Sequence, residues 1–224
     1  RNAAAIAHYS RLLADRLISI LGDGNKPVVL GGDCSILIGS MLALKRMGRF
    51  GLIFLDAHSD FRHPGNSKEL VAAAGEDLAI VTGRGDTRLI NLEGLGPYVQ
   101  DADVHVVGIR QADAHLDELR AKRIRVTTSK EIKAASPSQL ADQVIGTVTK
   151  HTSGFWVHLD ADVVDASEMI AVDCPEPEGP SVAALGMLLK RLISAPGCVG
   201  MHVTIYDPDR DPTGECADRL VSSL

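Results

Sequence analysis

The feature that most constrains the fold of this 224-residue chain is a series of short apolar segments that alternate with helical ones. Two of them, Val28–Leu30 and Gly51–Leu55, carry no polar side chain at all. A strand with one solvated face alternates apolar and polar residues, whereas a strand covered on both faces stays apolar. The pattern therefore predicts an α/β fold, a three-layer sandwich with a mostly parallel β-sheet and helices on both faces.

Periodicity and breaker residues give the expected elements. Asp33 is the expected N-cap of the helix that begins at Ile36, and Ser136 with Pro137 marks another helix start. No linker divides the chain, so residues 1–224 are expected to form a single domain. The start at Arg1, without a Met, predicts that an N-terminal part of the natural protein is missing. Helices are expected at 4–21, 36–47, 70–82, 112–122, 137–150, 182–194 and 213–224, and strands at 27–30, 51–55, 103–108, 124–127, 155–159 and 199–205.

The net charge and the cysteine pattern limit the kinds of binding partner and the cell compartment that we expect for this protein. The net charge is −6 and the sequence pI is about 5.7, which argues against nucleic acid as a partner. No apolar run approaches the roughly 18 residues of a membrane span, so no membrane partner is expected. Four widely spaced cysteines without a CxxC pair favour a reducing, cytoplasmic location.

The most informative polar residues directly follow the expected strands, where parallel sheets bind ligands. After the strand that ends at Leu55 comes Asp56-Ala57-His58-Ser59-Asp60. On an extended segment, positions i, i+2 and i+4 project the same way, so Asp56, His58 and Asp60 are expected to converge. A solvated acidic turn is the alternative interpretation.

A second acidic pair, Asp160 and Asp162, follows the strand that ends at Leu159. No basic residue lies nearby in sequence. Carboxylates combined with an imidazole suit hard or borderline divalent ions such as Mn²⁺. Four carboxylates exceed the needs of one ion, so two ions about 3.5–4 Å apart are expected.

The segment Gly31-Gly32-Asp33-Cys34-Ser35 follows the first strand and supplies a further candidate ligand. Its glycines allow a tight turn into the next helix. Cys34 is expected in the first turn of that helix, where the dipole favours the thiolate that binds metals. A buried cysteine that only fills core space is the alternative.

Together the three motifs resemble those of the arginase, agmatinase and formiminoglutamase family, the ureohydrolases. The family patterns are Gly-Gly-Asp-His-Ser, Asp-Ala-His-x-Asp and Ser-x-Asp-x-Asp-x-x-Asp-Pro. Here the first reads GGDCS at 31–35, the second DAHSD at 56–60, and the third HLDADVVDA at 158–166. The resemblance implies an arginase-like sheet, a homo-oligomer and a dimanganese centre that hydrolyses guanidino or formimino groups of a small-molecule substrate.

The same resemblance implies the role of each ligand. Asp56 and Asp160 would bridge both ions, and a bridging hydroxide would attack the substrate. Asp60 and His58 are the candidate catalytic residues, with Asp60 placed to hold the proton of the attacking water. The expected metal ligands are Cys34, Asp56, His58, Asp60, Asp160 and Asp162.

Three positions depart from the family pattern. Cys34 stands where most members have His, which makes Zn²⁺ or Fe²⁺ possible beside Mn²⁺. Ile205 stands where the family has the Glu that grips the guanidinium, and an apolar side chain cannot pair with a cation. The family's loop histidine corresponds to Ala73 or Ala74. The expected metal site is thus nearly complete, while the substrate pocket is altered.

The candidate substrate-binding residues are Asp113, His63, Glu76 and Glu176. Three functions compete. The first is a two-metal hydrolase of a C–N bond in a guanidino, amidino or formimino compound. The second is a relative that binds metal or ligand without turnover. The third is a metal-dependent deacetylase, for which one Zn²⁺ per chain would be expected.

Overall fold

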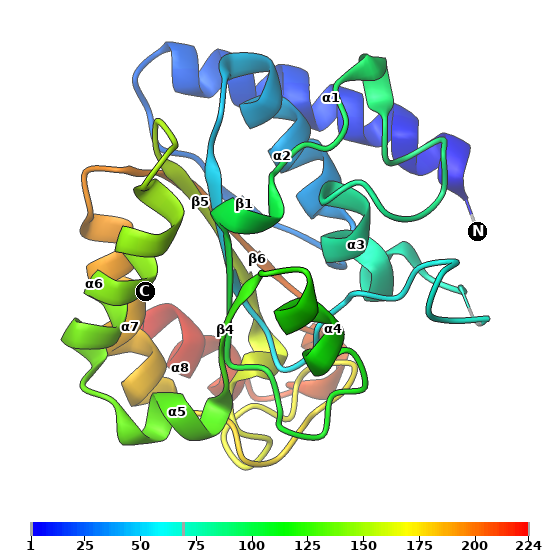
Figure 1. Cartoon of the computed structure of the whole chain (residues 1–224). Coiled ribbons are helices and arrows are strands. Elements are labelled where there is room, and N and C mark those ends of the chain that lie inside the picture. Colours follow the sequence, from blue (N-terminus) through cyan, green and yellow to red (C-terminus); the bar gives the residue numbers. More distant parts are fainter. Residues whose placement is uncertain (1, 69, 224) are drawn as a thin grey trace.

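A computed structural model describes residues 2–68 and 70–223, apart from the side chain of Ser223 (Figure 1). Its sheet has six strands in the order β1-β6-β5-β2-β3-β4, and every neighbouring pair is parallel. All carboxyl ends therefore meet at one edge of the sheet. The strands are β1 (Val28–Leu30), β2 (Gly51–Leu55), β3 (Val104–Val107), β4 (Arg125–Thr127), β5 (Phe155–Asp160) and β6 (Cys198–Thr204).

Helices cover both faces of the sheet, which confirms the three-layer α/β prediction. The long helices α1 and α2 pack against each other on one side, and α6 and α7 pack against each other on the other (Figure 1). None of the described helices is long and apolar enough to cross a bilayer. The helices are α1 (Ala3–Gly22), α2 (Ile36–Met47), α3 (Asp77–Val81), α4 (Leu116–Ala121), α5 (Ser129–Ala134), α6 (Pro137–Thr149), α7 (Val182–Ser194) and α8 (Glu215–Ser223).

Strand alternation divides the interior into two cores. In β2, Leu52 and Phe54 point into the core formed with α1 and α2, while Ile53 and Leu55 point into the core formed with α6 and α7. All four side chains are fully buried. Alternate residues of one strand thus bury apolar surface on opposite sides, which explains why the strand is apolar throughout.

The structure corrects four local expectations. The helix expected at 70–82 is only α3, preceded by a 3₁₀ turn at Ala73–Glu76 that contains the helix-weakening Gly75. The helix expected at 112–122 is limited to α4. The N-cap of α2 is Ser35, because Asp33 turns its Oδ1 back to accept from the Ser35 N–H at 2.9 Å.

The fourth correction is α5, which was not expected. Its start is a capping box: the Thr128 hydroxyl accepts from the Glu131 N–H, and the Glu131 carboxylate accepts from the Thr128 N–H at 2.7 Å. The pattern T-x-x-E was visible in the sequence. The helix that follows Ser136 does begin at Pro137 as expected, although the Ser136 side chain makes no capping bond.

We predict that Gly108→Ala destabilises the protein. Gly108 has φ +103°, and a Cβ there would lie 2.3 Å from Cγ2 of Val163 and 3.1 Å from the carbonyl oxygen of Asp56. Overpacking of this kind costs roughly 1–3 kcal/mol. The matched control is Gly146→Ala in α6, where a Cβ would meet nothing within 4 Å and helix propensity should add about 0.5–1 kcal/mol. Thermal unfolding checks both; equal melting temperatures for the two variants would contradict the packing account.

Candidate metal centre

Two acidic residues lie side by side where β2 and β5 end. The register pairs Leu55 with Leu159, so Asp56 and Asp160, the residues that follow them, occupy adjacent strand tips. Both are buried, with 1% and 3% of their surface exposed. Buried carboxylates are costly unless they are protonated, paired or bound to a cation.

Backbone N–H groups hold one oxygen of each carboxylate and leave the other oxygen for the cluster. Asp56 Oδ1 accepts from the His58 N–H at 2.7 Å, and Asp160 Oδ1 accepts from the Asp162 N–H at 2.8 Å. Asp162 Oδ1 accepts from the Ala57 N–H at 3.2 Å. These short turns after the two strands orient the acids before any ion is present.

The expected ligands are brought together in overlapping groups. Within each group, one ligand atom per residue lies within 4.8 Å of every other. The first and third groups share Asp56, and the first and second share Cys34. The groups are Cys34, Asp56, His158 and Asp160; Cys34, Asp60 and Asp77; and Asp56, His58 and Asp162.

The loop from Asp56 to Asp60 is bent, not extended as expected. β2 ends at Leu55, and Asp60 has φ +44°, a left-handed conformation that Asp tolerates better than most residues. As a result Asp60 lies on the Cys34 side of the cluster, while His58 lies on the Asp162 side with Nδ1 3.0 Å from Asp162 Oδ2.

The expected position of Cys34 in the first turn of the helix is wrong. α2 begins at Ile36, so Cys34 precedes the helix instead of lying in its first turn. Burial, and then the neighbouring Asp160, raise the pKa of Cys34 well above its ordinary value. The thiol accordingly donates to Asp160 Oδ2 at 2.8 Å, and Thr204 Oγ1 lies 3.1 Å from the sulfur.

Burial is the largest influence on the acids of the cluster, and repulsion between neighbouring carboxylates adds to it. Burial and neighbouring carboxylates raise the pKa of Asp60 and Asp160. Burial alone would raise the pKa of Asp56 too, but His158 and His58 outweigh it and lower that pKa. Asp162 and Asp56 raise the pKa of His58 to about 12. In the absence of cations, the cluster therefore holds protons.

The donor set fits divalent cations. In the described part of the chain, only His58 and His158 form ion-pair contacts with these strand-tip acids, and no lysine or arginine does. Three buried atoms lack a hydrogen-bond partner there: Asp56 Oδ2, Asp77 Oδ2 and His158 Nε2. Two divalent ions would neutralise the acids and engage orphaned oxygens.

Two residues at the Cys34 side were not expected as part of the site. Asp77, the first residue of α3, is fully buried and belongs to the group with Cys34 and Asp60. His158 lies two residues before Asp160 on β5, and alternation places both on the same face. That alternation could have revealed His158 from sequence. Asp77 depends on the path of the loop before α3, for which the sequence carries no clear signal.

His158 continues into a buried hydrogen-bonded chain. Its Nδ1 contacts His202 Nε2, and His202 Nδ1 accepts from the Trp156 indole N–H at 3.0 Å. Burial keeps the pKa of His202 well below its ordinary value. Phe54 stacks on the His158 ring with centroids 4.2 Å apart, which fixes the ring orientation.

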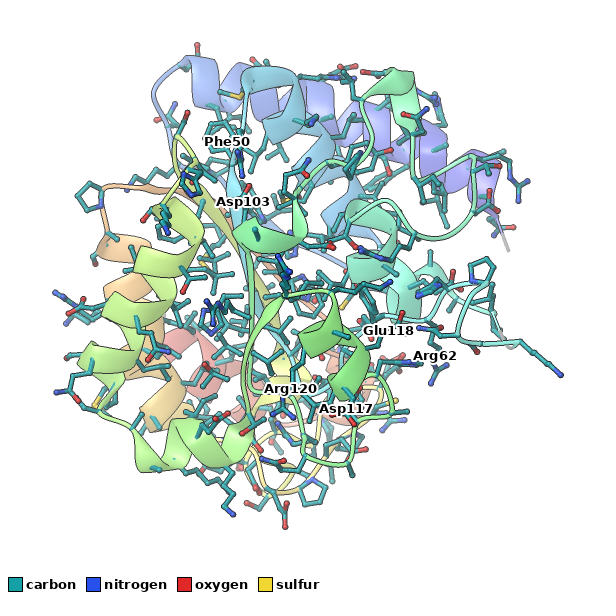
Figure 2. All side chains as sticks on the ribbon, in the orientation of Figure 1. Phe50, Arg62, Asp103, Asp117, Glu118 and Arg120 are labelled. Carbon is teal, nitrogen blue, oxygen red and sulfur yellow. The ribbon has the colours of Figure 1, made fainter. Side chains whose placement is uncertain are left out.

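A cavity of about 500 Å³ opens onto the cluster. Of the expected substrate-binding residues, Asp113, Glu76 and Glu176 line it. His63 is not among the described lining residues. Its Nε2 lies 3.1 Å from Oε1 of Glu118 on α4, a residue labelled in Figure 2.

The two departures expected in the pocket are found in the cavity wall. Ile205 lines the cavity in a left-handed conformation, φ +66°, which is strained for a β-branched residue. Ala74, rather than Ala73, lines it from the loop before α3. Neither side chain can exchange a proton or pair with a cation.

Arg110 lines the cavity and connects three neighbouring loop segments by hydrogen bonds. Its buried guanidinium donates to the carbonyl oxygens of Gly108, Val163 and Pro177 at 2.8–3.1 Å, among others. The arginine is thus occupied by backbone oxygens and not by the carboxylates.

We predict that Asp77→Asn stabilises the metal-free protein increasingly as pH rises. Burial, then Asp60 and Asp56, raise the pKa of Asp77 in the folded state. The folded chain therefore keeps a proton that the unfolded chain has lost, and stability falls as pH rises above the ordinary carboxyl range near 4. Asn mimics the protonated acid at every pH.

In chelator-treated protein, the melting temperatures of the variant and the wild type should be similar at pH 4 and separate by several degrees at pH 8, with about 2–4 °C for each kcal/mol. Asp117→Asn, whose side chain is fully exposed, is the control. A separation that is constant with pH, or that favours the wild type at pH 8, would contradict the account.

The fold agrees with comparisons to known proteins. The Arginase family model matches residues 2–224. An arginase of Brevibacillus brevis is 34% identical, over 98% of this chain and 75% of that protein. The Bacillus caldovelox arginase structure has a TM-score of 0.91 at 26% identity, and the Bacillus cereus arginase structure 0.89 at 28%; both matches cover this whole chain and 75% and 78% of those chains. The chain belongs to the arginase family, as the sequence motifs had indicated.

Proposed function

We propose that the protein is a dinuclear-metal hydrolase that cleaves a C–N bond in a small guanidino, amidino or formimino compound. The observation that carries the proposal is the cluster of buried strand-tip carboxylates that lack lysine or arginine partners among the described residues. Family membership supports the same chemistry, since the relatives include arginases and, in fold, a proclavaminate amidino hydrolase.

Six residues would hold two ions. Cys34 and Asp60 would bind one ion, His58 and Asp162 the other, and Asp56 and Asp160 both. Carboxylates with one imidazole favour Mn²⁺, whereas the Cys34 sulfur makes Zn²⁺ or Fe²⁺ possible. When bound, two such ions lower the pKa of a shared water so that it deprotonates near neutral pH.

A carboxylate of the chain itself would hold the proton that the attacking water releases. Asp60 is half-buried, lines the cavity and has its pKa raised by burial and by Asp56, so it is suited to hold a proton during the reaction. His58 lies between the cluster and the cavity mouth, with Nε2 3.8 Å from Glu176. It would bind one ion together with Asp162, which its Nδ1 faces, and its Nε2 is on the side of Glu176.

The charge of the cavity favours a cationic substrate. The acids Glu76, Asp113, Asp173 and Glu176 line it in addition to the cluster. Asp113 is fixed by the N–H groups of Ser59 and His115, whereas the Glu176 side chain is 43% exposed. Glu176 is therefore the acid best placed to meet the cationic group of an incoming molecule.

Ile205 and Ala74 favour a second candidate, a relative that binds metal and ligand without turnover. A panel of arginine, agmatine, guanidinobutyrate, N-hydroxyarginine and formiminoglutamate separates the two. Release of urea, hydroxyurea or formamide supports the hydrolase. Two bound ions without any product favour binding alone.

We predict that Asp160→Asn lowers the metal content from two ions per chain to one or fewer, because a shared ligand loses its charge. Turnover of the best panel substrate should fall at least about 100-fold, beyond the loss typical of outer-shell changes. Elemental analysis and product assays check this, with Asp117→Asn as the exposed control. Undiminished metal content in Asp160→Asn would reject the shared-ligand role.

We predict that Glu176→Gln raises KM for a cationic substrate by roughly 10- to 100-fold, the loss expected for one charge-assisted hydrogen bond. The metal content and kcat should stay near wild-type values, because Glu176 lines the cavity but belongs to none of the ligand groups. Steady-state kinetics and elemental analysis measure both. A fall in kcat with unchanged KM would place Glu176 in the chemical step instead.

A further inference from the structure

One buried group of polar side chains is not used by the proposed reaction. Trp156 and His158 lie on the face of β5 that carries Asp160, and His202 lies beside His158 on β6. All three are fully buried. A fully buried pair of histidines has an energetic cost unless each ring nitrogen is matched to a donor or an acceptor.

The indole of Trp156 determines where the protons of both histidines lie. An indole N–H can only donate, so His202 Nδ1, which receives it at 3.0 Å, carries no proton. The Ser40 hydroxyl, which donates to the Ile36 carbonyl oxygen, lies farther from the same nitrogen, at 3.3 Å. The proton of His202 is therefore on Nε2, from which it is donated to His158 Nδ1. His158 Nδ1 is then an acceptor, and the proton of neutral His158 must be on Nε2.

That remaining N–H is close to a carboxylate of the candidate metal centre. His158 Nε2 lies 3.6 Å from Asp56 Oδ2. Both atoms are buried and have no hydrogen-bond partner in the structure. The other oxygen of Asp56 already accepts from the His58 N–H. Stacking on Phe54 prevents the His158 ring from turning away.

We infer that Trp156, His202 and His158 form a tautomer relay that makes His158 a positioning residue for Asp56. The relay directs an N–H at Asp56 Oδ2 and so orients the carboxylate that two ions would share. The inference rests on the proposed dinuclear function. It also excludes His158 as a direct ligand, because the nitrogen that faces the cluster has no free lone pair.

The first arm of the test reads the tautomers in metal-free, ¹⁵N-labelled protein. Long-range ¹H–¹⁵N correlation spectra should show the Nε2–H form for both His158 and His202, assigned with His158→Phe and His202→Asn. An Nδ1–H form at His158 would overturn the inference. This arm needs no metal, so it decides the relay even if the protein binds no ion and the proposed function fails.

The second arm measures Mn²⁺ and Zn²⁺ affinity by chelator competition. His158→Phe keeps the aromatic stack but lacks the N–H, and it should weaken binding at least about tenfold. His105→Phe is the matched control: His105 is a buried strand histidine on β3 that contacts Thr127, and affinity should not change. Equal affinities for the two variants would overturn the inference.

Two further measurements keep the test decisive if His158→Phe does not fold. Trp156→Phe removes the donor that fixes the relay, and it should populate the Nδ1–H form of the histidines and weaken metal binding. Unchanged tautomers and affinity would overturn the relay. A coupling between ¹¹³Cd and His158 Nε2 in cadmium-loaded protein would show a direct ligand and contradict the positioning role.

Discussion

The free-energy cost of gathering carboxylates at one edge of a buried sheet is the constraint on which the rest of this structure depends. Parallel strands bring Asp56 and Asp160 to the same edge, and the turns after them add Asp60 and Asp162. The nearby guanidinium of Arg110 is committed to backbone carbonyl oxygens. Only protons or cations remain to offset the charge, and the raised pKa of Asp60 and of Asp160 reflects this.

The two sides of the cluster differ in chemical character. The His58 side, with Asp56 and Asp162, keeps the donors that the family resemblance implies. The Cys34 side has a sulfur in place of an imidazole and an added buried acid in Asp77, and the positioning residue His158 lies beside it on β5. Sulfur is softer than nitrogen, and the extra acid adds charge, so the two ions would experience different environments.

The sequence predicted most of the fold because the signals there are local. Apolar runs and glycine breaks predicted all six strands to within one residue at every end. The weak point was the segment from 70 to 82, where Gly75 and a 3₁₀ turn leave α3 only five residues long. The course of this segment depends on tertiary contacts, and it brings Asp77 close to Cys34 and Asp60.

The same distinction holds for the site. Strand register places Asp56 and Asp160 at adjacent strand tips, and the turns that follow bring His58 and Asp162 close to them. Spacing could not give the left-handed turn at Asp60 or the raised pKa of Cys34, which follows from burial and from the neighbouring acids. His158 was within reach of the alternation rule, but its importance depends on Trp156 and His202, the latter more than forty residues away in sequence.

Anomalous diffraction from crystals equilibrated with Mn²⁺ tests the central claim most directly. The account predicts two anomalous peaks within the cluster, one bordered by Cys34 and Asp60 and the other by His58 and Asp162, with Asp56 and Asp160 reaching toward both. Absence of both peaks at saturating Mn²⁺, with the acids turned toward arginine, lysine or amide donors, would contradict it.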